Sequence, residues 1–394
     1  MKTSNPLPLL MLMVIFSPLA IDIYLPALPI IASELSVSLT QMQWSISAFI
    51  LSMGFGQLIS GPLADKYGRK PVAVMGILIY GVSSLLAANA DNFEFLLAAR
   101  LLQGLGACAI VVAAFACVRD QYDALRSGMM YSYLNGAICC IPAMAPILGN
   151  ILTEQFGWRS NFDFMALYAL IAGVIIMLSL TESRPTNTLV SKQFFSVKPY
   201  IAVLKNPVFL FNSIIVMLAM SIILAYVTSS PAWLMVTLGL DQQTFVYWFS
   251  INAILNIIGC VLAPRVLVKW GARLTIGIGM LTLIGSGFLM IALRDWQDAM
   301  GFMLPVMLSS LGFSMLMGAC AGQALCAFGH NAGTASAMLG FIQMSGSALV
   351  VFLLQLLPLS ATDQLSILML GFIPVYVLWK SATIKKYIFT DLLS

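Results

Sequence analysis

The sequence predicts an all-α membrane protein whose twelve transmembrane helices form two six-helix bundles. Three observations support this prediction. Of the 394 residues, 60% are hydrophobic and only 9% are charged, and the mean hydropathy is +0.97. A water-soluble chain of this length needs far more polar surface to cover its core. Apolar runs long enough to cross a bilayer recur along the whole chain, and both halves carry a version of one charged loop.

Short polar connections divide the chain into twelve apolar segments. They span about residues 7–31, 41–64, 72–90, 94–117, 128–151, 161–181, 207–230, 243–263, 274–293, 301–323, 334–357 and 365–386. The first segment follows Lys2 like a signal peptide, but it is too long and contains Asp22, so we predict a membrane helix. The longest polar connection separates six segments from six. We therefore expect an N-terminal bundle over 1–181, a cytoplasmic linker over 182–206 and a C-terminal bundle over 207–394.

The basic residues predict the orientation of these segments. Lysine and arginine gather in the cytoplasmic connections of membrane proteins. With the N-terminus inside, all 19 basic residues except Arg100, Arg159 and Arg294 fall in cytoplasmic connections or at the termini. We therefore expect a multi-pass protein with both termini in the cytoplasm.

Catalytic and metal-binding constellations are missing from the sequence. The single histidine, His330, lies at a predicted helix end, where it is a surface residue or takes part in proton transfer. All seven cysteines fall in apolar segments, so we interpret them as small hydrophobic residues between helices. The net charge of +4 comes without a basic block that would suggest nucleic-acid binding. We expect neither an enzyme nor a cofactor or metal.

The charged loop between the second and third segments is the clearest repeated feature. Its sequence, GPLADKYGRKP at 61–71, contains too many charges for hydrocarbon and marks a membrane surface. Aligning Gly68 with Gly271, 203 positions later, pairs Lys66 with Lys269. The second copy has Val268 in place of Asp65. This duplication is typical of transporters built from two parallel repeats.

Two of the motifs resemble those of the major facilitator superfamily. The loop at 61–71 is similar to its signature loop, and LLAARLLQGLGAC at 96–108 is similar to its fourth-helix motif. A third stretch, GAICCIPAMAPILGN at 136–150, resembles the fifth-helix motif of drug antiporters, with Ala145 and Asn150 at two of its glycines.

Three further stretches resemble one branch of that superfamily. IDIYLPALP at 21–29, VRD at 118–120 and GWRSNF at 157–162 are similar to the bicyclomycin/chloramphenicol-resistance branch of drug:proton antiporters. The resemblance implies the major facilitator fold, a bacterial inner membrane and a lipid-embedded chain that we expect to be a monomer. It also implies export of small lipophilic drugs, chloramphenicol-like or cationic, against proton entry by alternating access.

Asp22 is the clearest single candidate for proton coupling. A carboxylate inside a membrane helix costs roughly 2.5–3.5 kcal/mol, so it should face a cavity. At a rise of about 1.5 Å per residue, Asp22 and Arg100 lie about 9 and 10 Å below the outer face. They form either a structural ion pair or a proton-exchanging site in which Arg100 sets the affinity of the acid. The resemblance also implies a coupling acid at this motif, whereas Val14 occupies the position of a second acid found in some relatives.

Substrate contacts are predicted less sharply. Asp22 and Gln103 are candidates, although Gln103 serves helix packing equally well. The other candidates are polar or aromatic residues in or near the membrane segments: Tyr24, Tyr131, Asn135, Asn212, Tyr226, Trp233, Asn252, Asn256, Gln323 and Gln343. Among these, Asn135, Asn256 and Gln343 are the most attractive, since drug pockets are mostly apolar with a few polar groups.

Asp65 and Arg69 are expected to act at the cytoplasmic surface as part of a conformational latch. Asp65 can pair with Arg119 or cap a neighbouring helix, and Arg69 can pair with Asp120 or Asp123. The alternative for Asp65 is a solvated surface charge.

The fifth segment contains residues that bend helices or let them approach closely. These are Gly136, Pro142, Pro146 and Gly149. They predict a bent, close-packed helix that forms part of a gate rather than a ligand site.

The function predicted from these features is proton-coupled multidrug efflux. The first alternative is proton-coupled transport of one metabolite, such as a sugar, an amino acid or a siderophore precursor. The second is a membrane receptor or scaffold that transports nothing, and neither the intramembrane charges nor the charged loop serves such a role. Drug molecules, protons and lipid are the expected partners.

Overall fold

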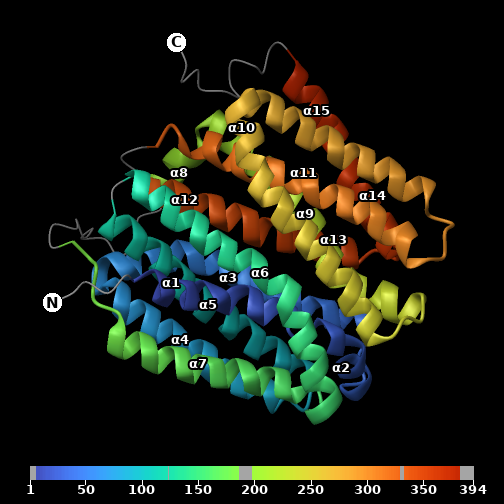
Figure 1. Ribbon diagram of the computed structural model, residues 1–394, viewed down its shortest axis with the longest axis horizontal. Helices are drawn as coiled ribbons and strands as arrows, with labels where there is room; N and C mark the ends of the chain where they lie inside the picture. The colour runs from blue at the N-terminus through green and yellow to red at the C-terminus, as the bar shows by residue number, and fades with distance from the viewer. Residues whose placement is uncertain (1–5, 123, 186–197, 329–331, 382–394) are drawn as a thin grey trace. The chain divides into compact units, whose positions relative to one another are not determined.

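The computed structural model describes residues 6–122, 124–185, 198–328 and 332–381. These residues form helices and connecting turns, with no β-strand among them (Figure 1). The predicted all-α class is confirmed. The chain divides into two compact units, Met1–Phe195 and Ser196–Ser394, and the boundary lies inside the segment that the sequence assigns to a linker.

The first unit is a helical bundle centred on α5. Its elements are α1 (Leu7–Asp22), the 3₁₀ turn η1 (Leu25–Ala27), α2 (Leu28–Glu34), α3 (Leu39–Tyr67), α4 (Arg69–Ala88), α5 (Phe93–Gln121), α6 (Ala124–Phe156) and α7 (Arg159–Ser179). Helix α5 packs against α3, α4 and α1, while α1 also packs along α6. The candidate residues of the N-terminal half therefore surround one central helix.

The second unit is a bundle of the same kind. Its elements are α8 (Lys198–Leu204), α9 (Pro207–Pro231), the π-helix η2 (Ala232–Thr237), α10 (Gln242–Ala292), α11 (Ala299–Leu325), α12 (Ala332–Phe341), the π-helix η4 (Ile342–Gly346), α13 (Ser347–Gln355), α14 (Ala361–Leu370) and α15 (Phe372–Lys380). Short α8, which lies in the predicted linker, packs against α12 (Figure 1). The linker segment is therefore partly helical.

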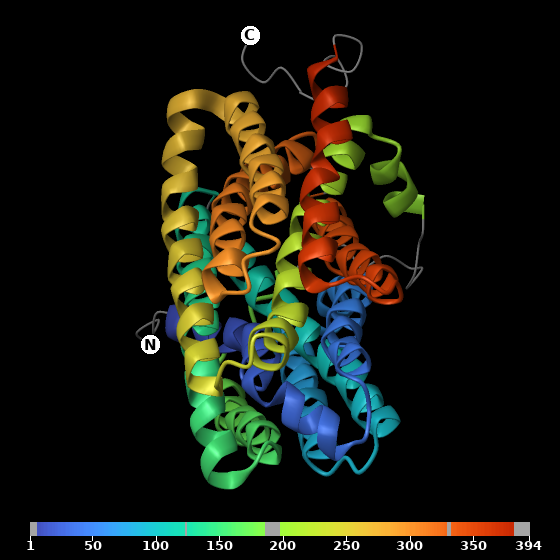
Figure 2. The same ribbon diagram turned by 90° about the vertical axis from the view of Figure 1, so that its right-hand side faces the viewer.

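The described part of the chain contains 11 helices long and apolar enough to cross a membrane. One of them, α10, is two helices joined at Gly271, whose φ of 75° is non-helical. Figure 2 shows α10 (gold) turning back on itself at its upper end. Gly68, the repeat partner of Gly271, also has a positive φ of 108°, so the same turn recurs in both units.

The first membrane span is not one helix. Helix α1 ends at Asp22, the chain passes through η1, and α2 resumes at Leu28. Pro26 causes the break because it has no N–H to donate to the carbonyl four residues earlier, which belongs to Asp22. The candidate coupling acid therefore lies at the end of a helix inside the predicted span of 7–31.

Glycines bring α4 and α5 into close backbone contact. A Cβ at Gly106 would lie 2.7 Å from the carbonyl oxygen of Gly76 and 2.7 Å from the backbone nitrogen of Tyr80. Neither atom can move without shifting a helix, so this packing requires glycine.

We predict that Gly106→Ala lowers the thermal unfolding midpoint of the purified protein in detergent. Overpacking of this kind costs about 1–3 kcal/mol. Gly285→Ala is the matched control, because a Cβ at Gly285 of α10 meets nothing within 4 Å. Equal midpoints for the two variants would show that the α4–α5 contact does not require glycine.

Candidate functional site

The carboxylate of Asp22 is buried at the end of α1. Its side chain is 4% exposed, and the described residues provide it with neither a hydrogen bond nor an ion pair. A charged carboxylate without a partner is costly at such a position. Asp22 is therefore stabilised by whatever neutralises it, either a proton or a cationic group.

Arg100 of α5 is completely buried beside the same break. The carbon atom of its guanidinium lies 4.8 Å from the ring centroid of Tyr24 and 4.5 Å from that of Phe49 in α3. Stacking on two aromatic faces stabilises a cation without neutralising it. Close packing of α3 on α5 supports this arrangement, since a Cβ at Gly104 would overlap the carbonyl oxygen of Phe49.

The hydrogen bonds of Arg100 are incomplete. Its Nη1 donates to Oε1 of Gln103, whereas Nε and Nη2 are buried without a hydrogen-bond partner in the described part of the chain. Gln103 in turn donates from Nε2 to Oγ of Ser84, over 2.7 Å. Gln103 is thus held by its own bundle, which favours a positioning role over direct substrate binding.

A second hydrogen-bond chain fixes Tyr24. The hydroxyl groups of Tyr24 and Ser45 are 3.0 Å apart, and Ser45 donates its single proton to the carbonyl of Met42 over 2.7 Å. Tyr24 must therefore be the donor to Ser45. Its ring is held against Arg100, so this predicted substrate contact also serves as a support for the buried cation.

Asp22 and Arg100 do not form an ion pair within 4 Å. Arg100 is instead held by Gln103 and by two aromatic rings. The structure thus contains a carboxylate and a guanidinium that are buried in the same bundle and not satisfied by one another. Such an arrangement can exchange a proton or accept a polar ligand without first breaking a salt bridge.

The predicted gate residues of α6 have unequal surroundings. Pro142 and Pro146 lie inside a helix that is continuous from Ala124 to Phe156. A Cβ at Gly149 would overlap the carbonyl oxygen of Ile23, whereas a Cβ at Gly136 would meet nothing within 4 Å. Gly149 therefore brings α6 directly against the broken part of the first span.

Arg69 is the centre of the candidate latch, which we define as Asp65, Arg69, Arg119 and Asp120. Its Nη1 lies 2.6 Å from Oδ1 of Asp65 and its Nε 2.7 Å from Oδ2 of Asp120. The Arg69 side chain is 2% exposed and that of Asp120 is 6% exposed, against 44% for Asp65. Asp65 pairs with Arg69 rather than with Arg119, which lies 3.9 Å from Asp120.

Glu182 completes this cluster, although the sequence analysis did not identify it. Its carboxylate accepts hydrogen bonds from the backbone N–H groups of Arg69, Lys70, Ser183 and Arg184, over 2.9–3.2 Å. It therefore caps the first turn of α4, whose own N-cap residue, Gly68, has no side chain. Partial burial alone would raise the pKa of Glu182. The four N–H groups together outweigh this effect and hold the pKa below its usual value.

Other predicted contacts lie apart from this site. Asn135 is exposed on α6, and Tyr131 donates to the carbonyl of Phe115 over 3.5 Å. In the second unit, Asn256 accepts a hydrogen bond from Cys260, and half-buried Gln343 lies in η4. The remaining second-unit candidates are Asn212, Tyr226, Trp233, Asn252 and Gln323; of these, Asn252 accepts from Ser310 and Tyr226 stacks on Phe249.

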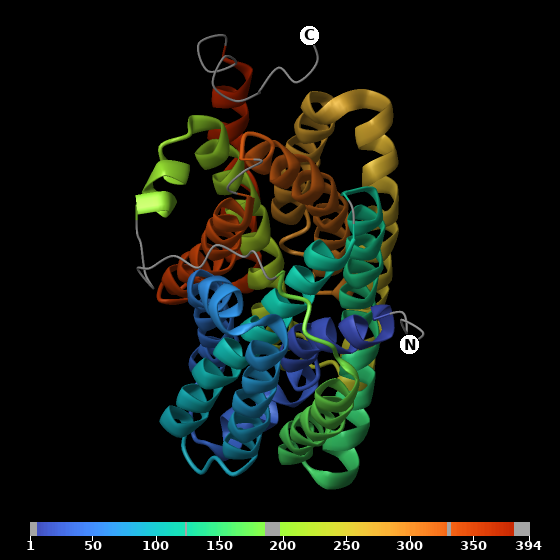
Figure 3. The same ribbon diagram turned by 90° about the vertical axis from the view of Figure 1, so that its left-hand side faces the viewer.

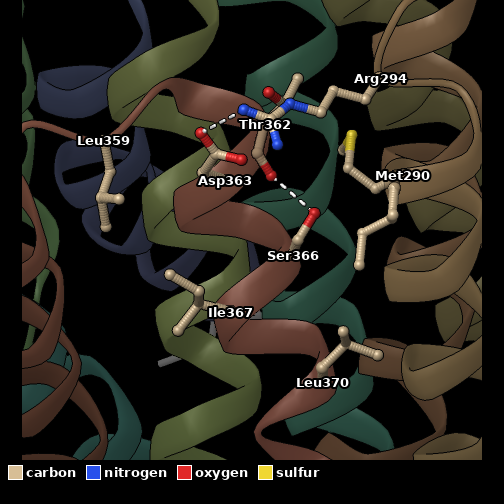
Figure 4. Close-up of a pocket in the computed structure, with 9 residues that line it drawn as sticks. Met290, Arg294, Leu359, Thr362, Asp363, Ser366, Ile367 and Leu370 are labelled. Atoms are coloured by element: carbon tan, nitrogen blue, oxygen red, sulfur yellow. Dashed lines mark hydrogen bonds and ion pairs between the residues drawn. The ribbon is translucent and has the colours of Figure 1, made fainter.

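A pocket of about 520 Å³ lies in the second unit between α10 and α14 (Figure 4). Its walls are mostly apolar, and its charged groups are Arg294 and Asp363, whose Nη2 and Oδ2 are 3.3 Å apart. None of the predicted coupling or substrate residues lines this pocket.

Several supporting residues escaped the sequence analysis. Ser45, Phe49 and Ser84 surround Tyr24, Arg100 and Gln103, yet an isolated serine or phenylalanine in an apolar segment gives no signal. His330 and Asp123 lie outside the described residues.

The sequence-family model of the Major Facilitator Superfamily matches residues 10–351 of this chain. The chain is 32% identical over 360 residues to the multidrug resistance protein MdtL of Salmonella paratyphi A, covering 91% of this chain and 90% of that protein. MdtL of Salmonella typhimurium is also 32% identical to this chain, over 359 residues that cover 91% of this chain and 90% of that protein.

Solved structures show the same fold at low identity. A D-xylose–proton symporter superposes with a TM-score of 0.79 at 14% identity, covering 95% of this chain and 96% of that one. The human organic anion transporter MFSD10 superposes with a TM-score of 0.70, also at 14% identity, covering 95% and 98% of the two chains. Together with the family match, these superpositions confirm the major facilitator fold.

We predict that Glu182→Gln lowers the free energy of unfolding by about 1 kcal/mol at neutral pH, since water screens this exposed carboxylate. The folded-state pKa of Glu182 is below the unfolded value, so its contribution is present at neutral pH. It is lost as the pH falls through the folded-state pKa, below 4.5. Thermal unfolding of both proteins across this pH range measures the difference.

Glu94→Gln, at an exposed position in the first turn of α5, is the control. A wild-type advantage over Glu182→Gln that stayed constant down to strongly acidic pH would contradict the capping role of the ionised carboxylate.

Proposed function

The chain belongs to the Major Facilitator Superfamily, and on this basis we propose that it is a proton-coupled multidrug efflux antiporter. Like the other members of its family, it is a multi-pass membrane transporter and not an enzyme. Relatives that cover nine-tenths of the chain are named multidrug resistance proteins, which supports drugs as the transported substrates.

The observation that carries this proposal is the state of Asp22. It is an acid at a helix break within a membrane span, 4% exposed and without a partner among the described residues. A helix interruption of this kind is where transporters of several folds place their coupling ions. A structural acid would be paired instead, as Asp120 is with Arg69.

In the proposed cycle, Asp22 binds a proton in one state and a cationic or polar drug in the other. Arg100 stays in place because its guanidinium is clamped between Tyr24 and Phe49 and bonded to Gln103. Its fixed positive charge sets how strongly Asp22 holds the exchangeable partner. With Val14 at the position of a second acid, coupling is concentrated on Asp22.

The latch of Asp65, Arg69, Arg119 and Asp120 is proposed to control access from the cytoplasm. Arg69, the first residue of α4, forms a buried ion pair with Asp120 at the end of α5 and a second pair with Asp65 at the end of α3. Breaking a buried pair by removing one partner costs about 3–5 kcal/mol, which is enough to shift a conformational equilibrium. In this proposal, both termini are cytoplasmic and the chain works as a monomer in a bacterial inner membrane.

We predict that Asp22→Asn abolishes proton-driven drug efflux, because asparagine cannot exchange a proton. Drug susceptibility of cells that overproduce each variant, with and without a protonophore, is the first measurement. Drug-induced proton release in inverted membrane vesicles is the second.

Asp163→Asn is the matched control, since Asp163 is an exposed acid on α7. Undiminished proton-driven efflux by Asp22→Asn would rule out this coupling scheme. Unchanged susceptibility of the wild-type strain to a broad drug panel would favour a specific metabolite instead.

We predict that Asp120→Asn impairs efflux more than Asp65→Asn does. Asp120 is 6% exposed and bound to a buried arginine, whereas Asp65 is 44% exposed; an exposed pair contributes only about 0–1 kcal/mol. Spin-label distances across the cytoplasmic ends of the two units would report the shift in population. A larger effect of Asp65→Asn, or no change in either variant, would contradict the latch.

A further inference from the structure

The GWRSNF motif at 157–162 resembles one family branch in sequence, but neither the coupling pair nor the latch uses it. It forms the corner between α6 and α7. The corner lies beside α2 in Figure 1 and at the lower end of the first unit in Figure 3. Its side chains contact the broken first span directly at two places and reach it at a third through Gly149 of α6, which suggests a role for the motif as a whole.

The first contact holds the end of α2. Glu34, the last residue of α2, accepts a hydrogen bond from Nε1 of Trp158 over 2.7 Å and a second from Nη1 of Arg159. Arg159 also stacks 4.3 Å from the ring centroid of Trp158 and donates to the carbonyl of Ala90 over 3.3 Å. One carboxylate is thus bound by two adjacent residues of the corner.

The second contact holds the break itself. Asn161 donates to Oγ1 of Thr153 over 2.8 Å, and Thr153 donates to the carbonyl of Gly149 over 2.7 Å. Because Gly149 has no side chain, its backbone lies directly against the carbonyl of Ile23. Ile23 is the residue that follows Asp22, so the position of α6 determines the location of the C-terminal end of α1.

The third contact is aromatic. The buried ring of Phe162 lies 5.3 Å from the ring of Tyr24 and 6.0 Å from that of Trp158, centroid to centroid. Tyr24 in turn supports Arg100. The corner therefore contacts the residues that flank both members of the coupling pair.

The contacts of the α6–α7 corner contribute more to the position of α2 than to the stability of the fold. The side chains of Arg159 and Glu34 are 38% and 45% exposed, and an ion pair of that exposure adds little to folding stability. The stretch from Ile23 to Glu34 is nevertheless held at both ends, and this limits the direction of the seven-residue α2 that it contains. The contacts define position more than they add stability.

We propose that the α6–α7 corner, through Trp158, Arg159, Asn161 and Phe162, is the positioning element of the coupling acid Asp22. The inference rests on the proposed antiport function. The corner and α2 move together, and a displacement of α6 is passed to the end of α1, where Asp22 lies. The ionisable groups that pack on α1 or on the break are Arg100 of α5, which stacks on Tyr24, and Tyr80 of α4 and Tyr168 of α7, whose rings both contact Phe16 of α1.

The test uses Arg159→Ala and Trp158→Phe in the full-length protein. Arg159→Ala should raise the hydrogen-exchange rate of backbone amides 28–35 by about fivefold. It should also shift the midpoint of the pH profile of drug:proton antiport in proteoliposomes by about half a pH unit or more. Trp158→Phe, which removes one hydrogen bond and keeps the ring, should show smaller shifts of both kinds.

Arg294→Ala is the matched control, because it removes another solvent-accessible ion pair, with Asp363, in the other unit. It should leave both readouts unchanged. The double variant Glu34→Arg/Arg159→Glu, which reverses the ion pair but not the hydrogen bonds to Trp158 and Ala90, should recover part of the shift in the pH profile. If Arg159→Ala acted only through a loss of packing, reversing the two charges would not rescue the pH profile.

Unchanged exchange in α2, or faster exchange with an unchanged pH profile, would overturn the inference. So would equal shifts in Arg294→Ala. The proposed antiport function is tested separately: it fails if the Asp22→Asn variant still carries out proton-driven efflux. Hydrogen exchange of the α2 amides can still be measured in that case.

Discussion

The rest of the first unit depends on one constraint, which is the break in the first membrane span between Asp22 and Leu28. A membrane interior has no water to satisfy backbone polar groups, so an interrupted helix is tolerated only where protein surrounds it. Each neighbouring helix contributes to that surrounding: Ser45 of α3 binds Tyr24, Arg100 of α5 packs on it, and Gly149 of α6 meets Ile23. These contacts leave the carboxylate of Asp22, and two nitrogen atoms of the Arg100 guanidinium, without a hydrogen-bond partner among the described residues.

The twelve apolar segments and the turn at Gly271 could be predicted because hydrophobic length and a repeated loop determine them. Depth counting along two helices also placed Asp22 and Arg100 at the same level, since rise per residue is nearly constant. It could not show that Arg100 stacks on Tyr24, because depth does not specify rotation about a helix axis. Glu182 could not be found for a related reason: it caps α4 from beyond the end of α7, and that proximity comes only from tertiary packing.

The two ends of the first unit are held in different ways. At one end, Arg69 and Asp120 form a pair that is 2% and 6% exposed; at the other, Arg159 and Glu34 are 38% and 45% exposed. A buried pair resists separation because each charge would be left uncompensated, whereas an exposed pair exchanges readily with water. The first arrangement suits a latch with two discrete states. The second suits a contact that guides a helix without locking it.

The duplicated loops show that the two units have diverged in charge rather than in backbone. Gly68 and Gly271 both adopt positive φ, but a side chain at Gly271 would meet nothing within 4 Å, and Val268 is 88% exposed. The position equivalent to Arg69 is Ala272, so the second copy keeps the turn and lacks the arginine that unites the latch. Buried contacts of the described second unit are uncharged instead, such as Asn252 with Ser310 and Gln355 with Thr228. Because a proton acts on the rest of a protein through charge, we propose that the coupling chemistry belongs to the first unit, which has the buried ions.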